Sequence, residues 1–468
     1  MRNCFGNKQL IYFIFSIVLI QQILVQTGCA HIIPPTGGDK DTLPPVPVKS
    51  IPKDSVLNFN GNKITIDFDE FIELDRPFEN VILSPNPNKQ PVLESRLKTL
   101  SIRLKDSLLP NTTYSIDFGY SIKDINEGNI LKDYKFVFST GTTIDTKELS
   151  GKVILAENGK VDSTLIVTLY NNLDDSAVAK KKPFYYTRLK GDGTFRFTNL
   201  PAGKFALYAL KDANGNKQYD SPTETFAFAD KFIEMTDTTA PVTLYAYAEE
   251  KETPRPASGI TKAEKRLIYN NNLENRHQSL IEPFAFTFGK PLKYFDSTKI
   301  SFTDSSHNLI KNYQWIKDTS NKKITLQYQW QPGMVYQLIL QKDFAADTMG
   351  YQLTKIDTVI FAAKKPEDYG SLRLKFTNLD KTKNPVLQFV SQDKVVKSVV
   401  ITEAVWSEKL VNPGDYELRV LYDDNKNGVW DPGKFSGVHK QPERVVPVAA
   451  KLTVKANWEN ENVVDLKQ

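Results

Sequence analysis

Apolar and polar residues alternate in short segments along much of this chain. The alternation is clear in residues 63–68 (KITIDF), 99–104 (TLSIRL) and 114–118 (YSIDF). A period of two places successive side chains on opposite faces of a β-strand. Runs such as Pro110–Thr112 and Asn126–Asn129 lie between these segments and favour turns. The pattern predicts an all-β fold in which short strands pack as β-sandwiches.

The strand pattern occurs twice. Residues 110–114 (PNTTY) match residues 332–336 (PGMVY), and further on Gly203 matches Gly414, 211 residues later. A repeat of this length indicates duplicated folding units. We therefore expect four tandem sandwiches in the order A–B–A′–B′, each of an ordinary domain size.

The strand repeat and the local composition together divide the chain into seven segments. They are a signal peptide (1–28), a linker rich in Pro and Gly (29–47), module A (48–145), module B (148–247), a second linker (248–280), module A′ (281–364) and module B′ (368–458). In the second linker, Thr261 and Glu264 have the spacing of a capping box, which favours a short helix over Thr261–Leu273. Lys265–Tyr269 could equally open a strand of module A′.

The N-terminus has the features of a secretory signal. Two basic residues precede the apolar run Leu10–Ile20, and Gly28 stands directly before Cys29. This arrangement resembles the lipobox of bacterial lipoproteins, although Gln26 departs from it. The resemblance implies that Cys29 becomes the N-terminus and carries the lipid. An uncleaved anchor and an ordinary signal peptide are the alternatives. Cys4 would be lost with the signal, so no internal disulfide could form.

Composition and charge exclude some classes of function. The chain has 60 Lys and Arg, 55 Asp and Glu, and a net charge of +5, without a basic stripe. This distribution and the secretory signal argue against nucleic-acid binding. No other apolar run reaches the roughly 18 residues of a membrane span. The pattern predicts a protein that is tethered to a membrane at one end.

Residues 34–145 resemble the Ig-like lipoproteins of Bacteroidota. The resemblance rests on PPTGGDKDTLPP after Cys29, FDEFIEL (68–74), NTTYSIDFGYSIKDINEGN (111–129) and FVFSTG (136–141). Module A is similar to the Ig-like domain of surface-layer proteins, and module B, through residues 191–216, to prealbumin-like and carboxypeptidase-regulatory-like sandwiches. The resemblance implies an outer-membrane location. In lipoproteins of this kind, acids directly after the lipidated cysteine accompany export to the cell surface. Here the first acid after Cys29 is Asp39, so the resemblance implies the periplasmic face rather than the cell surface.

Two matching loops are the candidate metal sites. Each carries oxygen side chains at alternating positions, as calcium loops do: Asp212, Asn214, Asn216 and Asp220 in module B, and Asp423, Asn425, Asn427 and Asp431 in module B′. Position 12 lacks the expected Glu in both loops, and Glu224 could replace it in the first loop alone. The alternative is a loop of Asx-turns without metal.

Other residue clusters have simpler interpretations. Asp67 and Asp69 alternate with Phe68, so the carboxylates of Asp67, Asp69, Glu70 and Glu73 are expected on a solvated face. Asp124, Asn126 and Glu127 are expected in a hairpin loop. Exposed tryptophans could stack on a glycan; the chain has Trp315, Trp330, Trp406, Trp430 and Trp458.

No catalytic motif of the Ser-hydrolase, zinc-protease or P-loop type is present in the sequence. We therefore expect a non-catalytic lipoprotein of the outer membrane that serves as a scaffold, as a subunit or accessory of an outer-membrane protein complex. The alternative is a module for glycan binding or calcium-dependent adhesion at the cell surface.

Overall fold

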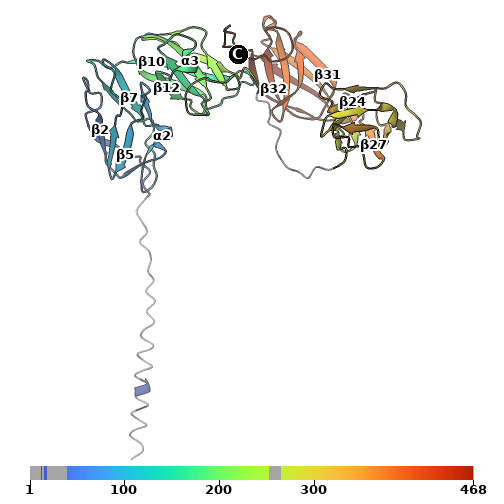
Figure 1. Cartoon of the computed structure of the whole chain (residues 1–468), viewed down its shortest axis with the longest axis horizontal. Coiled ribbons are helices and arrows are strands. Elements are labelled where there is room, and N and C mark those ends of the chain that lie inside the picture. The colour runs from blue at the N-terminus through green and yellow to red at the C-terminus, as the bar shows by residue number, and fades with distance from the viewer. Residues whose placement is uncertain (1–11, 13–14, 18–39, 252–264, 467–468) are drawn as a thin grey trace, which may run out of the picture. The chain divides into compact units, whose positions relative to one another are not determined.

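The computed structural model of the chain describes residues 12, 15–17, 40–251 and 265–466. Figure 1 shows that strands form most of the described segments, which confirms the all-β prediction. Cys29, the signal segment and most of the first linker lie outside the described residues. Within the described residues, no helix has the length and apolar character that crossing a membrane requires.

Module A consists of three sheets. They are β1 (Pro47–Ile51), β2 (Lys63–Phe68), β6 (Thr99–Arg103) and β5 (Val92–Arg96) in that order; β3 (Ile72–Leu74) with β8 (Ile122–Asp124); and β4 (Ile82–Ser84), β7 (Thr113–Asp117) and β9 (Lys135–Ser139). A single helical turn, α2 (Pro77–Asn80), precedes β4. In β2 the alternation predicted from sequence holds, because Ile64 and Ile66 are fully buried while Lys63 is exposed.

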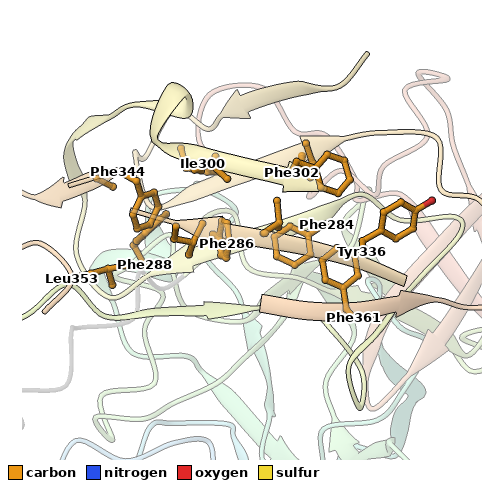
Figure 2. Packing of buried hydrophobic residues seen from close by; sticks show 14 of the residues in the cluster. Phe284, Phe286, Phe288, Ile300, Phe302, Tyr336, Phe344, Leu353 and Phe361 are labelled. Carbon is orange, nitrogen blue, oxygen red and sulfur yellow. The ribbon is translucent and has the colours of Figure 1, made fainter. Parts of the chain in front are cut away.

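Module A′ repeats this topology. Its sheets are β18 (Tyr269–Asn271), β20 (Phe284–Phe288), β24 (Lys323–Gln327) and β23 (Gln314–Lys317); β21 (Leu292–Phe295) with β26 (Ala345–Asp347); and β19 (His277–Gln278), β27 (Asp357–Ala363), β25 (Val335–Leu340) and β22 (Ile300–Asp304). A 3-10 turn, η1 (Ser297–Lys299), replaces α2. Figure 2 shows its aromatic core, in which the rings of Phe284 and Phe361 stack at 5.3 Å.

The prediction of a short helix over Thr261–Leu273 is wrong for residues 265–273, the part of this range that the structure describes. Tyr269–Asn271 form β18, which pairs with β20 and buries part of the Tyr269 ring against the core of module A′. The competing prediction, a strand near Tyr269, was therefore the better one. Residues 252–264 lie outside the described residues. Module A′ thus begins before its expected start at residue 281.

Module B is a sandwich of two sheets around one core. The first is β13 (Thr194–Leu200), β10 (Lys147–Leu155) and β17 (Val242–Ala246); the second is β12 (Tyr185–Arg188), β11 (Ile166–Tyr170), β14 (Gly203–Leu210) and β15 (Phe226–Phe228), with β16 (Ile233–Met235) also paired to β14. The short helix α3 (Ala177–Lys180) follows β11. β10 and β17 pair in parallel, while the other strands pair antiparallel.

Module B′ repeats the order of module B. Its sheets are β31 (Val405–Val411), β28 (Gly370–Thr377) and β34 (Glu459–Asp465), and β30 (Lys394–Val400), β29 (Pro385–Ser391), β32 (Gly414–Tyr422) and β33 (Arg444–Val454), with 3-10 turns η2 (Pro366–Asp368) and η3 (Lys381–Lys383). The last strand lies beyond the expected end at residue 458. It pairs in parallel with β28, as β17 pairs with β10.

Local geometry supports the repeat residue by residue. The Tyr114 hydroxyl accepts a hydrogen bond from the backbone N–H of Leu109 at 2.7 Å, and the Tyr336 hydroxyl accepts one from Gln331 at 3.0 Å. Gly203 and Gly414 open equivalent strands with φ of 149° and 152°, a conformation that excludes most side chains. The predicted A–B–A′–B′ duplication is therefore present in the fold.

A feature that the sequence did not predict joins module B′ to module B within one compact unit. Residues 432–442, the clasp, form a loop closed by two backbone hydrogen bonds of 2.8 Å between Lys434 and Lys440. Phe435 in this loop is only 6% exposed, and its ring centroid lies 5.0 Å from that of Phe226 in module B. The clasp follows the second candidate loop, and module B has no counterpart to it.

Polar contacts surround the buried ring of the clasp. The N–H of Phe435 donates to Oε1 of Glu249 at 2.9 Å, and Nε2 of Gln441 donates to Oδ1 of Asp230 at 2.7 Å. Nε2 of His439 lies 3.0 Å from Oδ2 of Asp175. The clasp therefore combines an apolar plug with a polar rim, which is the usual anatomy of a stable protein interface.

Candidate functional site

The first candidate loop joins β14 to β15 and is shaped by its own side chains. Oδ2 of Asp220 accepts hydrogen bonds from the side-chain amides of Asn214 at 3.2 Å and Asn216 at 2.8 Å. Oδ1 of Asp212 accepts from the backbone N–H of Lys217 at 3.0 Å. The side-chain amide of Asn216 is the main reason that the pKa of Asp220 falls below its ordinary value.

The second loop, between β32 and β33, has the same internal bonds. Oδ2 of Asp431 accepts from the side-chain amides of Asn425 at 2.5 Å and Asn427 at 2.8 Å. The carboxylate of Asp423, 2% exposed, accepts from the N–H groups of Asn427 and Gly428. The structure thus brings all eight sequence-predicted residues into two equivalent loops.

Each loop is followed by a glutamate: Glu224 was named from sequence, whereas its counterpart Glu443 was missed. Glu224 lies two residues before Phe226, which pairs with Leu210, and Glu443 lies two residues before Val445, which pairs with Leu421. The carboxylates of Glu224 and Glu443 accept from the N–H of Asp220 at 3.2 Å and of Asp431 at 3.0 Å. The second loop therefore has an acid equivalent to Glu224, and a role for either glutamate in calcium binding stays a prediction.

Burial affects these two glutamates in the same direction. It is the largest cause of the raised pKa of Glu224 and of Glu443. For Glu443, which is 2% exposed, backbone N–H groups of Asp431 and Asp424 partly offset the increase. Each loop therefore contains a carboxyl group that accepts from the backbone, and the carboxyl group of Glu443 is also buried, whereas that of Glu224 is partly exposed.

The donor chemistry of the loops fits calcium, which prefers carboxylate and amide oxygens. The arrangement in the structure is different, because Asn425 and Asn427 direct N–H groups rather than oxygens toward Asp431. Across residues 40–251 and 265–466, no three His, Cys, Asp or Glu side chains lie close enough to share a metal ion. Calcium binding therefore stays a prediction, and it requires the asparagine side chains to rotate.

The carboxylates of β2 and of the segment after it each contact a different partner. Asp67 accepts from Oγ1 of Thr99 at 2.6 Å, and Oδ1 of Asp69 accepts from the N–H of Val46 at 2.8 Å. Glu73 forms an ion pair with Lys123 at 2.9 Å. These contacts hold neighbouring segments of module A together, so Asp67, Asp69 and Glu73 each have a structural partner.

Asp124 organises the turn that follows β8. Its side chain, 1% exposed, accepts hydrogen bonds from the backbone N–H groups of Glu127, Gly128 and Asn129 at 2.6, 3.0 and 2.6 Å. Burial alone would raise the pKa of Asp124, but these three donors outweigh it and lower the pKa. The role of Asp124 is structural, as expected for a hairpin loop.

Most of the tryptophan side chains that could stack on a glycan are packed in the interior. Four of the five tryptophans pack in or against hydrophobic cores: Trp315, Trp330, Trp406 and Trp430. A hollow of about 760 Å³ lies beside Asp220, but its aromatic residues Tyr219 and Phe435 are only 7% and 6% exposed. Trp458, at 62% exposure, stands apart from these, with Lys455 5.0 Å from its ring centroid.

The fold and loops define a class of protein: tandem β-sandwiches of the Ig-like type. Residues 41–140 match the family model of the bacterial Ig-like domain, and residues 156–265 match a family described as an uncharacterized protein conserved in bacteria. The chain therefore carries a bacterial Ig-like domain followed by a second conserved bacterial domain.

Solved structures resemble the chain only distantly. The Bacillus anthracis TIE protein is 13% identical, over 92% of this chain and 76% of that one, with a TM-score of 0.17. BcpA, the major pilin subunit of Bacillus cereus, is 11% identical, over 68% and 99%, with a TM-score of 0.17. Scores this low carry no argument about function. The comparison with curated proteins gave no match.

Proposed function

We propose that this chain is a lipoprotein of the outer membrane, anchored through Cys29, on its periplasmic face. In this proposal it acts as a non-catalytic scaffold, a subunit or accessory of an outer-membrane protein complex. Two or three acyl chains on one cysteine give stable anchoring, whereas a single chain is marginal. The bacterial Ig-like domain at residues 41–140 is of a kind that suits such a role.

The observation that carries the proposal is the clasp. It fastens module B′ to module B although module A′ lies between them in sequence, and it does so with a buried ring and a rim of polar bonds. A scaffold must hold its surfaces in fixed positions, and non-covalent fastening between distant modules serves that need. The contact is formed by the aromatic rings of Phe226, Phe228 and Phe435. Such packing favours a permanent connection between the two modules over a binding site for a ligand.

The test is purification of the full-length protein, tagged at its C-terminus, from native membranes in mild detergent. We expect the wild type in the outer-membrane fraction with an integral membrane protein in stoichiometric amount, identified by mass spectrometry. The matched variant Cys29→Ser should leave the membrane fraction. Membrane retention of Cys29→Ser would contradict the anchor. Recovery of the wild type alone would contradict the scaffold and direct attention to glycan arrays and calcium-dependent adhesion.

A further inference from the structure

Module A exposes three large apolar side chains on one face. Phe71, Leu97 and Ile125 are 43%, 65% and 52% exposed. They are neighbours, because the N–H of Ile125 donates to the carbonyl of Phe71 at 3.1 Å and the N–H of Ile72, next to Phe71, donates to the carbonyl of Leu97 at 3.0 Å. We call this surface, with its nearby acids Asp41, Asp69, Glu70 and Glu127, the tether face.

Module A′ shows that the fold does not require these apolar residues. The N–H of Thr348 donates to the carbonyl of Pro291 at 3.0 Å, and the N–H of Leu292 donates to the carbonyl of Asn321 at 2.8 Å. These are the same two hydrogen bonds in the second copy. The three apolar residues of the first copy therefore correspond, in order, to Pro291, Asn321 and Thr348.

Leu97 is also an unusual residue for its backbone conformation. Both Leu97 and Asn321 have φ of 56°, in the left-handed region. Asn tolerates this region because its short polar side chain can bond locally, whereas a leucine there is strained. Strain at a residue that is largely exposed points to a function outside the folding of the domain.

Two acids of the tether face, Asp69 and Glu70, are likewise specific to the first copy. The N–H of Asp69 donates to the carbonyl of Val46, and the equivalent N–H of Gly289 donates to Ile268. The residues of module A′ equivalent to Asp69 and Glu70 are therefore Gly289 and Lys290. After burial, the charges of Asp124, Asp69, Asp41 and Glu127 raise the pKa of Glu70. One cation lies among these acids, because Nζ of Lys98 is 5.5 Å from the ring centroid of Phe71 and donates to the carbonyl of Asp69.

The tether face also lies where the chain enters the domain. Nδ2 of Asn129 donates to the carbonyl of Asp41 at 3.1 Å, and the N–H of Asn129 donates to Asp124, next to Ile125. Asp41 is 12 residues from Cys29, a distance of at most about 40 Å for an extended chain. A lipidated Cys29 would therefore keep this surface near the membrane.

We propose that the tether face binds a partner protein whose contact surface carries apolar residues surrounded by Lys and Arg. The inference rests on the proposed function and names the surface and the chemistry of the partner. The tether face could contact either the membrane surface or a partner protein. Its acidic residues favour the protein, because anionic lipid headgroups repel an acidic face and a basic protein surface attracts it. The apolar triplet would supply the buried centre of the interface.

The test uses the full-length protein and the double variant Leu97→Asn with Ile125→Thr, which places the residues of the second copy in the first. The matched control is Leu309→Asn in module A′, since Leu309 is 69% exposed. A photo-reactive residue in place of Ile125 identifies the contacting molecule in native membranes. Affinity is then measured between purified partners at low and high salt.

We expect a cross-link from position 125 to a basic segment of one protein, and affinity that falls at least tenfold in the double variant and with salt. The control should bind as the wild type does. Equal affinity of the double variant would overturn this inference while leaving the scaffold intact. A cross-link to lipid would also overturn it, in favour of the membrane surface. Failure to recover any partner with the wild type would instead contradict the proposed function.

Discussion

The ring of Phe435, in module B′, lies 5.0 Å from the ring of Phe226, in module B, and both side chains are nearly or fully buried. Replacing Phe435 with Ala removes this contact and leaves a cavity among aromatic residues. We expect a loss of about 3 kcal/mol in the free energy of unfolding, as for other buried Phe residues. Urea denaturation of the full chain measures it. Val438→Ala, in the same clasp but 73% exposed, should change little.

Gly433 allows the clasp to approach module B closely. A Cβ atom at this position would lie 2.6 Å from Cζ of Tyr247 and 2.7 Å from the carbonyl oxygen of Lys440. We expect Gly433→Ala to lower the melting temperature, because neither neighbour can withdraw without breaking the contact. The control is Gly191→Ala, whose Cβ would meet nothing within 4 Å. An equal melting temperature for Gly433→Ala and the wild type would show that the clasp adapts.

Leu97→Asn should stabilise module A. The substitution relieves a left-handed leucine and exposes no new apolar surface, which favours the folded state by about 1 kcal/mol. Scanning calorimetry of the full chain would detect the gain in the transition of this module. Leu43→Asn, equally exposed but with ordinary backbone, should have no such effect. A decrease in stability would mean that Leu97 packs in a way that its exposure does not suggest.

Asp124→Asn should destabilise module A, because an amide cannot accept from three backbone donors as the carboxylate does. Hydrogen bonds to a charged group suggest a loss of about 2 kcal/mol. The pKa of Asp124 is lowered in the folded state, so this stabilisation is complete above the ordinary value of about 3.9 and is lost as the pH falls through the lowered pKa. The two proteins should therefore converge in stability in acid. Glu127→Gln is the exposed control.

The calcium prediction can be tested by melting temperature. If Asn425 and Asn427 turn their oxygens inward, millimolar calcium should raise the melting temperature of the wild type through preferential binding to the folded state. The double variant Asp431→Asn with Glu443→Gln should lose the contribution of the second loop, and Asp220→Asn with Glu224→Gln that of the first. No shift with calcium, or the same shift with magnesium, would contradict a calcium site.

Much of the architecture could be predicted from sequence, because strand periodicity and turn residues are local signals. Tyr114 and Tyr336 illustrate this, since their matching motifs form the same hydrogen bond. The candidate loops were found for a similar reason: Asp212 and Asp423 open identical patterns of oxygen side chains. The linker strand at Tyr269 was harder, because three residues carry too little periodicity to exclude a helix.

Glu443 could not be found from the loop pattern alone. The clasp is inserted between Asp431 and β33, so Glu443 is displaced from the spacing that relates the two loops. The contact of Phe435 with module B could not be predicted either, because the sequence of residues 432–442 does not indicate which aromatic residues it would meet. The contrast between Leu97 and Asn321 became visible only after strand pairing established that they are equivalent.

The clasp has a mechanical consequence. Module A′ lies in the covalent path from module B to module B′, and the clasp forms a second, shorter path around it. A pull between module B and β34 would be carried by the contact of Phe435 together with the other contacts between the two modules, such as the hydrogen bond of 2.9 Å from the N–H of Val445 to the carbonyl of Ala156 and the ion pair of Lys160 with Asp393. Module A′ would bear little load while these contacts hold. If all of these contacts broke, module A′ would be the remaining covalent connection between modules B and B′, and the load would then pass through it.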